Sequence, residues 1–565
     1  MTTISGQTTV GALLAQRAAL TPDLTAYQAH EHGDWHEHRW RDIHHAALTV
    51  AAALDALDIR PGERCAVLAA TRVAWVLAGL GILTAGNATA PISPSSTPEQ
   101  MAHLLRDSGA QLMFVENPAQ LDKLAQVLSE NLLVRHIVLL EGAPSSDLPL
   151  PTHSWAEFWQ LGLDHRAAHQ ARVLARVNGV QAGDVASIVS TSGTTGEPRG
   201  AVLTHGNFTA VCDALGAALP VTDSDVQLLL LPLAHIFGRM LVLTSITWGS
   251  AVIFARDPTA PQLDAQVVRP TWLGGVPRFF EKVHAQLHGA PERLIVALGG
   301  RFRFAVSAGA LLAPELVQFF QAGGVPILDV YGLTETTSAL TLNRLGEARP
   351  GTVGRPLPGV RLRIAHDGEV LFRSPGTMRE YLGKPEATAA AIDPDGWFHT
   401  GDIGTLDADG FLRLTDRKKD LIITSGGKNV APAAIEQRVR QGRWVSEGVV
   451  YGDGRKSLTL LVTLDRAAVL AHAEAHGLDT GDWVALCRHP TVRALVEADV
   501  EAANAGLASF ETIKRYAVLP SDFAESGDVT PTLKVRRARV IEKHRHLLDS
   551  LYEDLPAPGE ARIRP

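Results

Sequence analysis

Cysteine is scarce in this chain, and its scarcity argues against two kinds of site. Only Cys65, Cys212 and Cys487 occur among 565 residues, far apart and without C-x-x-C spacing. Such spacing fits neither a disulfide framework nor a cysteine metal site. A reducing compartment suits the chain, so we expect a cytoplasmic protein.

A signal peptide and long hydrophobic runs are also missing. The N-terminus, MTTISGQTTVGALLAQRAALTPD, lacks a basic start followed by a continuous apolar core. Residues 75–91 form the most apolar stretch, but Gly86, Asn87 and Pro91 interrupt it, and it is shorter than the ~20 apolar residues of a membrane span. We expect a buried helix that runs into a strand there. No integral membrane span is predicted, and peripheral contact with a membrane stays open.

An excess of positive charge is absent as well. The chain has 52 Lys and Arg against 60 Asp and Glu, a net charge of -8, which argues against nucleic acid as a partner. With 46% hydrophobic and 20% charged residues, its composition is that of a folded globular protein. Because domains usually hold ~150 residues, this length predicts two to four compact units.

Helix-like and strand-like segments alternate along much of the chain. Residues 41–57 and 98–107 have helical patterns, and the short apolar runs at residues 65–68 and 111–115 are typical of strands. Further strand-like runs lie at residues 226–231, 251–255, 271–274, 304–307 and 327–330. This alternation predicts an α/β fold with largely parallel, helix-covered sheets.

The pattern changes after Gly351, where short alternating runs and a hairpin signal at residues 407–410 predict a β-rich subdomain. The charged run DRKKD at residues 416–420 follows, and mixed strand and helix patterns come after it. We expect a large N-terminal domain over residues 1–415 and a small mobile α+β domain over residues 416–565.

A loop rich in glycine and hydroxyl residues, STSGTTGEPRG, spans residues 190–200 directly behind an apolar run. Its unhindered backbone N–H groups and hydroxyls suit the oxygens of a polyphosphate. The loop contains no lysine and does not match G-x-x-x-x-G-K-[ST], which disfavours a kinase or motor ATPase. On composition alone, a flexible connector is the alternative.

Four further stretches follow this loop in order. They are YGLTET at residues 331–336, GWFHTGD at 396–402, DRKKD at 416–420 and PTLKVRR at 531–537. Taken singly, each also fits an ordinary role as a core aromatic, a first-turn helix acid, a turn former or a solvated basic run. Together and in this order, the five stretches resemble the adenylate-forming superfamily of acyl-CoA synthetases, luciferases and peptide-synthetase adenylation domains. The similarity covers nearly the whole chain.

The resemblance implies that a carboxylic acid reacts with ATP to form acyl-AMP and is then transferred to CoA. Two anions approach each other in the first step, so cations and well-aimed donors are required. The implied ATP site consists of Thr191, Ser192, Gly193, Thr194, Thr195, Gly196 and Arg199 for the phosphates, Ser307, Ala308, Gly309, Ala310, Tyr331 and Gly332 for adenine, and Asp402 with Arg417 for the ribose.

The resemblance also implies catalytic roles for four residues. Thr334 would contact the α-phosphate, and Glu335 would supply an oxygen to Mg²⁺. Lys534 would bridge the carboxylate and the α-phosphate, because an ammonium on a flexible stem can reach both. His235 would lie near the acyl entrance. One departure concerns Arg199, which stands where the family usually has lysine, and it leaves the closing of the loop in question.

For the second half reaction, the resemblance implies that the small domain rotates about Lys419. Gly426 and Gly427 would then line the path of the CoA pantetheine arm, since glycines allow a ligand to approach the backbone.

The segment LPLAHIFGR at residues 231–239 bears on the substrate. It lacks the carboxylate with which peptide-synthetase members bind an amino acid, and it is similar to long-chain fatty acyl-CoA synthetases. Nearby apolar side chains could line an acyl tunnel or form an ordinary core: Phe237, Met240, Leu241, Leu243, Trp248 and Val276. The alternatives are an acyl-AMP ligase that loads a carrier protein, a non-catalytic lipid-binding relative, and an oxygen-dependent luciferase-like activity.

Six histidines gather near the N-terminus, namely His30, His32, His36, His38, His44 and His45. Alternate histidines on a strand could hold a metal ion. However, Gly33 and Asp34 form a hairpin signal, and an exposed hairpin tolerates histidine well. We therefore assign no metal to this cluster.

Overall fold

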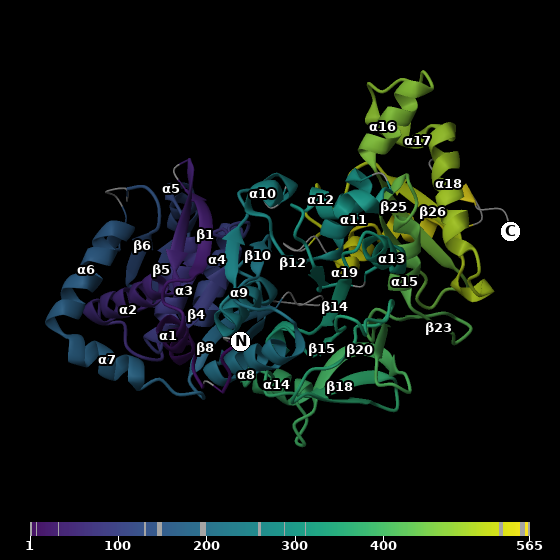
Figure 1. The fold of residues 1–565 in the computed structure, drawn as a ribbon. Coiled ribbons are helices and arrows are strands. Elements are labelled where there is room, and N and C mark those ends of the chain that lie inside the picture. The colour runs from purple at the N-terminus through teal and green to yellow at the C-terminus, as the bar shows by residue number, and fades with distance from the viewer. Residues whose placement is uncertain are drawn as a thin grey trace.

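The computed structural model describes residues 3–6, 8–31, 33–128, 132–143, 148, 150–191, 199–257, 261–287, 289–310, 312–529, 535–553 and 560–562. Figure 1 shows an N-terminal part at the left and centre, a β-rich part at the bottom and a C-terminal part at the upper right.

Two large sheets form the N-terminal part. Within the described residues, the first sheet has eight strands in the order β19-β9-β8-β4-β3-β5-β6-β7, and its centre is parallel. Its strands are β3 (Arg64–Leu68), β4 (Ala88–Ile92), β5 (Leu112–Val115), β6 (His136–Leu139), β7 (Thr152–Ser154), β8 (Val185–Thr191), β9 (Arg199–Thr204) and β19 (Glu380–Tyr381).

The second sheet has nine strands among the described residues, in the order β16-β15-β14-β13-β12-β10-β11-β1-β2. Strands β10 to β14 are parallel to their neighbours within that group. The strands are β1 (Thr25–Glu31), β2 (Asp34–Arg39), β10 (Val226–Leu229), β11 (Ala251–Phe254), β12 (Trp272–Gly275), β13 (Phe304–Ser307), β14 (Ile327–Tyr331), β15 (Thr341–Leu342) and β16 (Arg355–Pro356).

Helices cover both sheets. Side chains of α1, α2, α3, α8 and α9 fill one core between the sheets, α4 and α5 cover the outer face of the first sheet, and α11 and α13 cover that of the second. The helices of this part are α1 (Val10–Leu20), α2 (Trp40–Ala56), α3 (Val73–Thr84), α4 (Pro98–Ser108), α5 (Pro118–Ala125), α6 (Trp155–Ala168), α7 (Gln170–Asn178), α8 (His205–Ala218), α9 (Ile236–Trp248), α10 (Pro261–Val268), α11 (Pro277–Gln286), α12 (Leu294–Ala297) and α13 (Pro314–Ala322).

Strand β3 shows why the apolar runs become central strands. Cys65 and Val67 point into the core between the sheets, while Ala66 and Leu68 point into the outer core under α4 and α5. A strand that is buried on both faces needs continuous rather than alternating apolar residues. The same burial explains the apolar stretch at residues 75–91, which is a buried helix followed by a strand, as predicted.

The histidine-rich segment forms the predicted hairpin. Strands β1 and β2 pair in antiparallel fashion, with Gly33 in the turn at φ 97°. The ring of His30 lies edge-on to Trp35, and His32 lies outside the described residues. In the part of the chain that the structure describes, no three His, Cys, Asp or Glu side chains come together as a metal site.

The β-rich part is a four-stranded antiparallel sheet of β17 (Arg361–Ile364), β18 (Glu369–Arg373), β20 (Phe398–Leu406) and β21 (Leu412–Arg417). The predicted hairpin at residues 407–410 joins β20 to β21, and the amide of Gly410 donates to the carbonyl of Asp407 at 3.0 Å. The short helix α14 (Pro385–Ala391) precedes β20.

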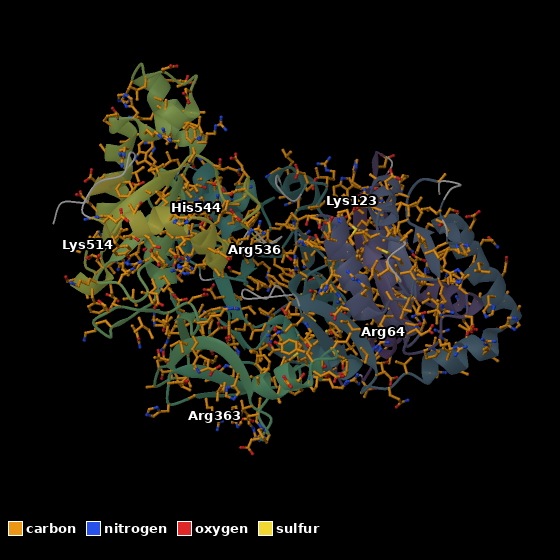
Figure 2. All side chains as sticks on the ribbon, turned by 180° about the vertical axis from the view of Figure 1, so that it is seen from behind. Arg64, Lys123, Arg363, Lys514, Arg536 and His544 are labelled. Atoms are coloured by element: carbon orange, nitrogen blue, oxygen red, sulfur yellow. The ribbon has the colours of Figure 1, made fainter. Side chains whose placement is uncertain are left out.

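The C-terminal part has its own hydrophobic cores. Its elements are β22 (Ile422–Ile423), β23 (Asn429–Val430), α15 (Pro432–Arg440), β24 (Val445–Tyr451), β25 (Leu458–Leu464), α16 (Arg466–Ala475), α17 (Trp483–Arg488), α18 (Pro490–Asn504), β26 (Ile513–Leu519), α19 (Arg537–Lys543), α20 (Arg545–Ser550) and β27 (Glu560–Arg562). Figure 2 shows the molecule from behind, with Lys514, Arg536 and His544 on this part. The α/β fold class with a smaller α+β part is therefore as predicted. The boundary after residue 415 remains a proposal, and β21 spans it.

A hydrogen bond links the C-terminal part to the N-terminal part. The side-chain amide of Gln441 donates to Glu315 on α13 at 2.8 Å. Glu447 is partly buried, and the charge of Arg278 on α11 acts on it. Desolvation raises its pKa to about 6, although Arg440 and Arg278 oppose the shift. None of the helices among the described residues combines the length and hydropathy that a membrane span needs.

Candidate functional site

The YGLTET stretch forms a tight loop at the end of β14. A Cβ on Gly332 would lie 1.5 Å from the carbonyl oxygen of Ser338, so only glycine fits there. Thr337 and Ser338 have φ values of 55° and 86°, a strained conformation for residues with side chains. The loop thereby holds Thr334 and Glu335 on a single 3₁₀ turn, Thr334–Thr336.

Tyr331, Asp402 and Arg417 lie in direct contact. The Tyr331 hydroxyl donates to Asp402 Oδ2 at 2.5 Å, and Arg417 Nε lies 3.2 Å from Asp402 Oδ1. The β20–β21 register places Asp402 opposite Arg417, which brings the carboxylate and the guanidinium together. Burial and the Asp402 charge raise the pKa of Tyr331 well above its usual value. The Tyr331 ring packs against Phe372, with 5.9 Å between the ring centroids.

Glu335 has a partner that the sequence did not indicate. The Tyr381 hydroxyl donates to Glu335 Oε1 at 2.7 Å, and the Arg199 guanidinium lies over the Tyr381 ring, 5.5 Å from its centroid. Nothing in the local sequence distinguishes Tyr381 from an ordinary core aromatic. Glu335 Oε2 has no protein partner among the described residues, so this oxygen could accept a hard cation such as Mg²⁺.

The glycine- and hydroxyl-rich segment at residues 190–200, here called the phosphate-type loop, has its two ends side by side. Thr191 ends β8, Arg199 begins β9, and the Thr191 hydroxyl donates to the Arg199 carbonyl at 3.2 Å. The remaining predicted loop residues lie outside the described residues, namely Ser192, Gly193, Thr194, Thr195 and Gly196. Lys534 also lies outside them.

Two buried polar groups adjoin the predicted adenine turn. Ser307 and Asp329 are register partners on the parallel strands β13 and β14. The Ser307 hydroxyl is buried and lacks a hydrogen-bond partner among the described residues, and burial raises the pKa of Asp329 to about 7. Ala308, Gly309 and Ala310 follow, with Gly309 at φ 92°. Unpaired polar groups at the carboxyl ends of parallel strands suit a ligand that supplies the missing hydrogen bonds. Sequence reasoning did not identify Asp329.

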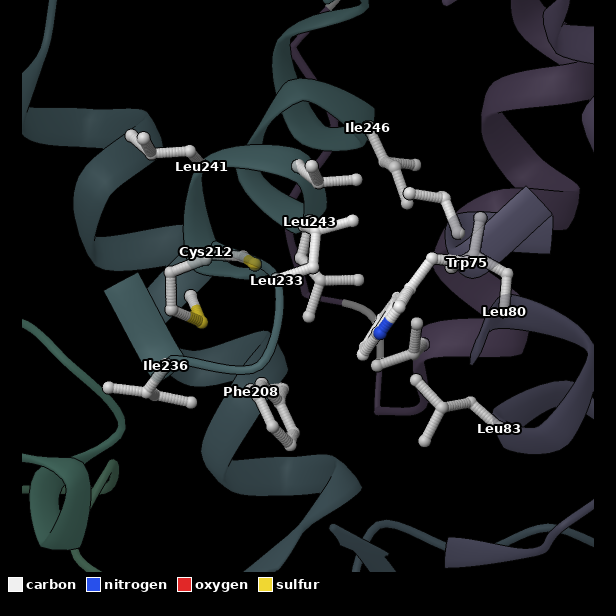
Figure 3. Close-up of a cluster of buried hydrophobic side chains, with 14 of the residues drawn as sticks. Trp75, Leu80, Leu83, Phe208, Cys212, Leu233, Ile236, Leu241, Leu243 and Ile246 are labelled. Carbon is white, nitrogen blue, oxygen red and sulfur yellow. The ribbon is translucent and has the colours of Figure 1, made fainter. Parts of the chain in front are cut away.

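His235 precedes α9 as its N-cap residue. Its Nε2 is buried without a partner among the described residues, and burial lowers its pKa, so the imidazole is neutral at neutral pH. From α9, Met240, Leu241 and Trp248 enter the core between the sheets. Figure 3 shows Leu241, Leu243 and Ile246 of α9 in one cluster with Trp75 and Leu83 of α3 and Phe208 of α8.

A small, almost wholly apolar cavity lies between α3 and α9. Of the six residues predicted to line an acyl tunnel, only Leu243 lines this cavity. Phe237 and Val276 are partly buried against the same core, and Leu241 packs on Gly274 of β12. The cavity wall contains Trp75, Gly79, Leu83, Val242 and Arg239.

Arg239 anchors α9 to the first sheet. Its guanidinium donates to Ser187 Oγ at 2.8 Å and to Thr89 Oγ1 at 2.9 Å, and it lies between the rings of Trp75 and Phe208. Burial lowers its pKa to about 9. Arg239 therefore connects the helix that follows His235 to β8, the strand that leads into the phosphate-type loop.

The predicted hinge begins next to an anchored lysine. Lys418 Nζ contacts Asp367 at 2.6 Å and Glu369 at 3.0 Å, both in the β-rich part. The pKa of Lys419 is lowered by burial and by the positive charge of Arg417. Its backbone amide donates no hydrogen bond to any described residue.

Gly426 and Gly427 occupy an exposed turn between β22 and β23. Gly427 has φ 70°, and no atom lies within 4 Å of the position that a Cβ would take. Its amide donates to the Thr424 carbonyl at 2.8 Å. The turn therefore leaves its backbone open to an approaching ligand.

Several of the predicted residues form one connected row through Tyr381. Arg199 contacts Tyr381, which binds Glu335, and the same loop leads back to Tyr331 and from there to Asp402. The row offers the Arg199 guanidinium and the Glu335 carboxylate, both in contact with Tyr381, at one end and the buried Asp402 carboxylate at the other. Such a row can hold a polyphosphate with its metal at one end and a hydroxyl-bearing group at the other.

Two family models match the chain. The AMP-binding enzyme model covers residues 14–382, and the AMP-binding enzyme C-terminal domain model covers residues 419–556. The chain is 31% identical to the long-chain-fatty-acid–CoA ligase FadD15 of Mycobacterium bovis, over 97% of this chain and 98% of that protein. It is 27% identical to the peroxisomal long chain acyl-CoA synthetase 6 of Arabidopsis thaliana, over 94% and 84% of the two chains.

Two solved structures have the same fold. The anthranilate CoA ligase AuaEII in complex with anthranoyl-AMP matches with a TM-score of 0.74 and 20% identity over 95% of this chain and 98% of that one. ATP-bound MatB from Rhodopseudomonas palustris matches with a TM-score of 0.73 and 23% identity over 95% of this chain and 99% of that one. With the two family models covering most of its length, the chain belongs to the AMP-binding enzyme family.

Proposed function

We propose that this protein converts a fatty acid, ATP and CoA into acyl-CoA, AMP and pyrophosphate. In the first step a carboxylate oxygen attacks the α-phosphorus of ATP and pyrophosphate leaves. In the second step the CoA sulfur attacks the acyl carbon and AMP leaves. The observation that carries the proposal is the row of contacts from Arg199 to Asp402, in which Tyr381 contacts Arg199 and Glu335, and Tyr331 contacts Asp402.

The proposed ATP site assigns the triphosphate to the loop between Thr191 and Arg199, with Thr334 at the α-phosphate. Asp402 would accept hydrogen bonds from the ribose hydroxyls, and Arg417 stabilises its charge. Glu335 would hold Mg²⁺, whose chemistry is to offset the growing negative charge on the phosphate oxygens. The unpaired Ser307 hydroxyl supports placing the base near β13 and β14.

The proposed acyl site lies along α9. Its side chains are buried and apolar except for Arg239 and a few hydroxyls, which suits a hydrocarbon chain at ~0.8 kcal/mol per buried methylene. The whole-length similarity to long-chain-fatty-acid–CoA ligases favours a fatty acid over a small acid. Lys534 would act in the first step only, and rotation about Lys419 would bring the turn of Gly426 and Gly427 to CoA in the second.

A cytoplasmic location is part of the proposal. The three cysteines are free and buried, which suits a reducing compartment.

The experiment is to measure acid-dependent AMP release with straight-chain acids from acetate to arachidate, with and without CoA. We expect release that depends on a medium or long chain and acyl-CoA as the product. Acyl-AMP that accumulates unless a carrier protein is added would favour the carrier-loading alternative. Fatty acid binding without AMP release would favour a non-catalytic relative.

A further inference from the structure

Tyr381 lies between the two charged groups that the proposed function assigns to the ATP phosphates and to Mg²⁺. Its hydroxyl donates to Glu335 Oε1 at 2.7 Å, and its ring lies under the Arg199 guanidinium at 5.5 Å. We infer that Tyr381 is a positioning residue that aims the free oxygen of Glu335 at the metal and holds Arg199 at the phosphates. The inference rests on the proposed function and extends it to a residue outside the recognised motifs.

The backbone of Tyr381 is fixed on both sides. Strand β19 pairs with β9 so that Tyr381 lies opposite Ala201, and the next amide, that of Leu382, donates to the Gly200 carbonyl at 2.8 Å. The amide of Tyr381 itself donates to Thr388 Oγ1 at 2.9 Å. The side chain on this anchored backbone is itself buried, so its hydroxyl has little freedom to move.

A second contact joins the β19 segment to the Glu335 loop. The amide of Met378 donates to the Glu335 carbonyl at 2.6 Å. Backbone and side chain of Glu335 are thus both held by the segment that carries Tyr381. With Oε1 occupied by the tyrosine, the carboxylate presents Oε2, which has no protein partner among the described residues.

The ring contact explains how this chain accommodates an arginine in the loop. A planar guanidinium stacks on an aromatic face and keeps its edge N–H groups free for oxygens, which an ammonium does less well. Packing alone does not require the hydroxyl, because phenylalanine would fill the same volume. The hydroxyl instead points at a carboxylate, and hydrogen bonds to charged groups are worth about 1.5–3 kcal/mol.

The test uses Mn²⁺ as a paramagnetic stand-in for Mg²⁺ and a non-hydrolysable ATP analogue, so that no turnover is needed. For Tyr381→Phe we expect the affinity for Mn²⁺ in the presence of the analogue to fall about tenfold. The affinity for the metal-free analogue should fall much less, because the ring that lies under Arg199 remains. Tyr516→Phe is the matched control, because its hydroxyl donates to the Arg493 carbonyl at 2.9 Å in the C-terminal part. Unchanged Mn²⁺ affinity in Tyr381→Phe would overturn the inference.

Two further variants separate hydroxyl from ring. In the Glu335→Gln background, Tyr381→Phe should change Mn²⁺ affinity no further, because the carboxylate that the hydroxyl aims is gone. Additive losses would count against the inference. Tyr381→Leu removes the ring as well, and we expect it to weaken binding of the metal-free analogue several-fold beyond Tyr381→Phe, through the loss of the Arg199 contact.

The outcomes distinguish this inference from the proposed function. If Tyr381→Phe weakens Mn²⁺ binding but no acid gives acyl-AMP in the wild type, the proposed function fails and the positioning role stands. If acyl-AMP forms and Mn²⁺ affinity does not respond to Tyr381→Phe, the positioning role alone fails. A wild type that binds neither the analogue nor Mn²⁺ would overturn both.

Discussion

Asp329 shows how one buried residue couples the nucleotide region to pH. Burial raises its pKa from the ordinary value of 3.8 to about 7 in the folded protein. Below about pH 3 the carboxyl is protonated in both states, whereas between about pH 4 and 7 only the unfolded chain loses the proton. The folding cost therefore grows with pH by roughly 1.4 kcal/mol per unit and levels off near pH 7.

Asp329→Asn removes this titration while keeping the shape of the side chain. We expect the variant to melt at a higher temperature than the wild type near pH 8 and at a similar temperature near pH 4, with an upper bound of about 4 kcal/mol at the higher pH. Thermal unfolding at both pH values measures the effect. An equal difference at the two pH values would contradict the assigned protonation.

Arg199→Lys tests the residue that departs from the family pattern. Either cation can contact a phosphate oxygen, so we expect adenylation to persist with a KM for ATP raised several-fold, because lysine stacks less well on the Tyr381 ring. Arg349→Lys is the control, since Arg349 stacks on Phe411 at 4.3 Å and bonds Asp407 away from the site. Complete loss of activity would show that a guanidinium is required.

The motifs indicated some of the residues that lie in contact here, but not all of them. Asp402 and Arg417 could be paired in advance because each lies in a recognisable stretch, and β20–β21 pairing then brought them together. The contact between Tyr381 and Glu335 could not be predicted, because it depends on β19 pairing with β9, a strand about 180 residues earlier. Local patterns carry no information about such a pairing.

At the scale of elements, α9 carries a charge in a nearly wholly buried helix. Arg239 has no carboxylate partner in the described residues, and the hydroxyls it binds also bond each other, Thr89 to Ser187 at 2.9 Å. Removing the charge therefore leaves few unsatisfied groups. Replacing a buried charge by an apolar side chain of similar size is often neutral or stabilising.

Two substitutions separate charge from volume at this position. We expect Arg239→Met to change the unfolding free energy by less than about 1 kcal/mol or to raise it, because methionine fills the volume. Arg239→Ala should lower it by about 2–5 kcal/mol, because a cavity opens between Trp75 and Phe208. Denaturant titration compares them. A large loss in both variants would show that the charge itself holds α9 in place.

Hydropathy and turn residues predicted several of the elements, including the strands at residues 65–68, 251–255 and 304–307. The way in which these elements assemble could not be predicted from the same patterns. The β1–β2 hairpin was expected, but its place at the edge of the nine-stranded sheet depends on Tyr27 and Gln28 pairing with Val252 and Ile253. Pairings this distant in sequence are set by tertiary packing rather than by local propensity.

At the scale of the whole molecule, Lys419→Pro tests the proposed rotation. The Lys419 amide makes no hydrogen bond to a described residue, and Lys418 stays tied to Asp367 and Glu369, so proline should not disrupt this arrangement. It would restrict φ at the hinge. We expect acyl-AMP to accumulate while thioester formation collapses. Parallel assays of acyl-AMP and acyl-CoA decide, and equal loss of both products would contradict a hinge role.

Lys534→Ala is the complementary variant. If Lys534 acts only in the first step, the variant should fail to make acyl-AMP from acid and ATP yet still convert supplied acyl-AMP and CoA into acyl-CoA. Opposite defects in Lys419→Pro and Lys534→Ala are expected for an enzyme whose small domain takes a different orientation in each half reaction. A variant that loses both half reactions would show that one arrangement serves both.

The partly buried Glu447 makes the docking of the two parts a proton-linked equilibrium. Glu447 has a pKa of about 6 in the docked arrangement, against an ordinary value of 4.5, and the charges that act on it are those of Arg440, Arg278, Glu281 and Asp522. If the parts separate and Glu447 meets water, its pKa falls, so docking takes up a proton between about pH 4.5 and 6. Above about pH 6 the docking is therefore weaker by roughly 2 kcal/mol than it is below about pH 4.5. Protons thus act as an effector of interdomain geometry, and Glu447→Gln should make energy transfer between fluorophores on the two parts independent of pH in this range.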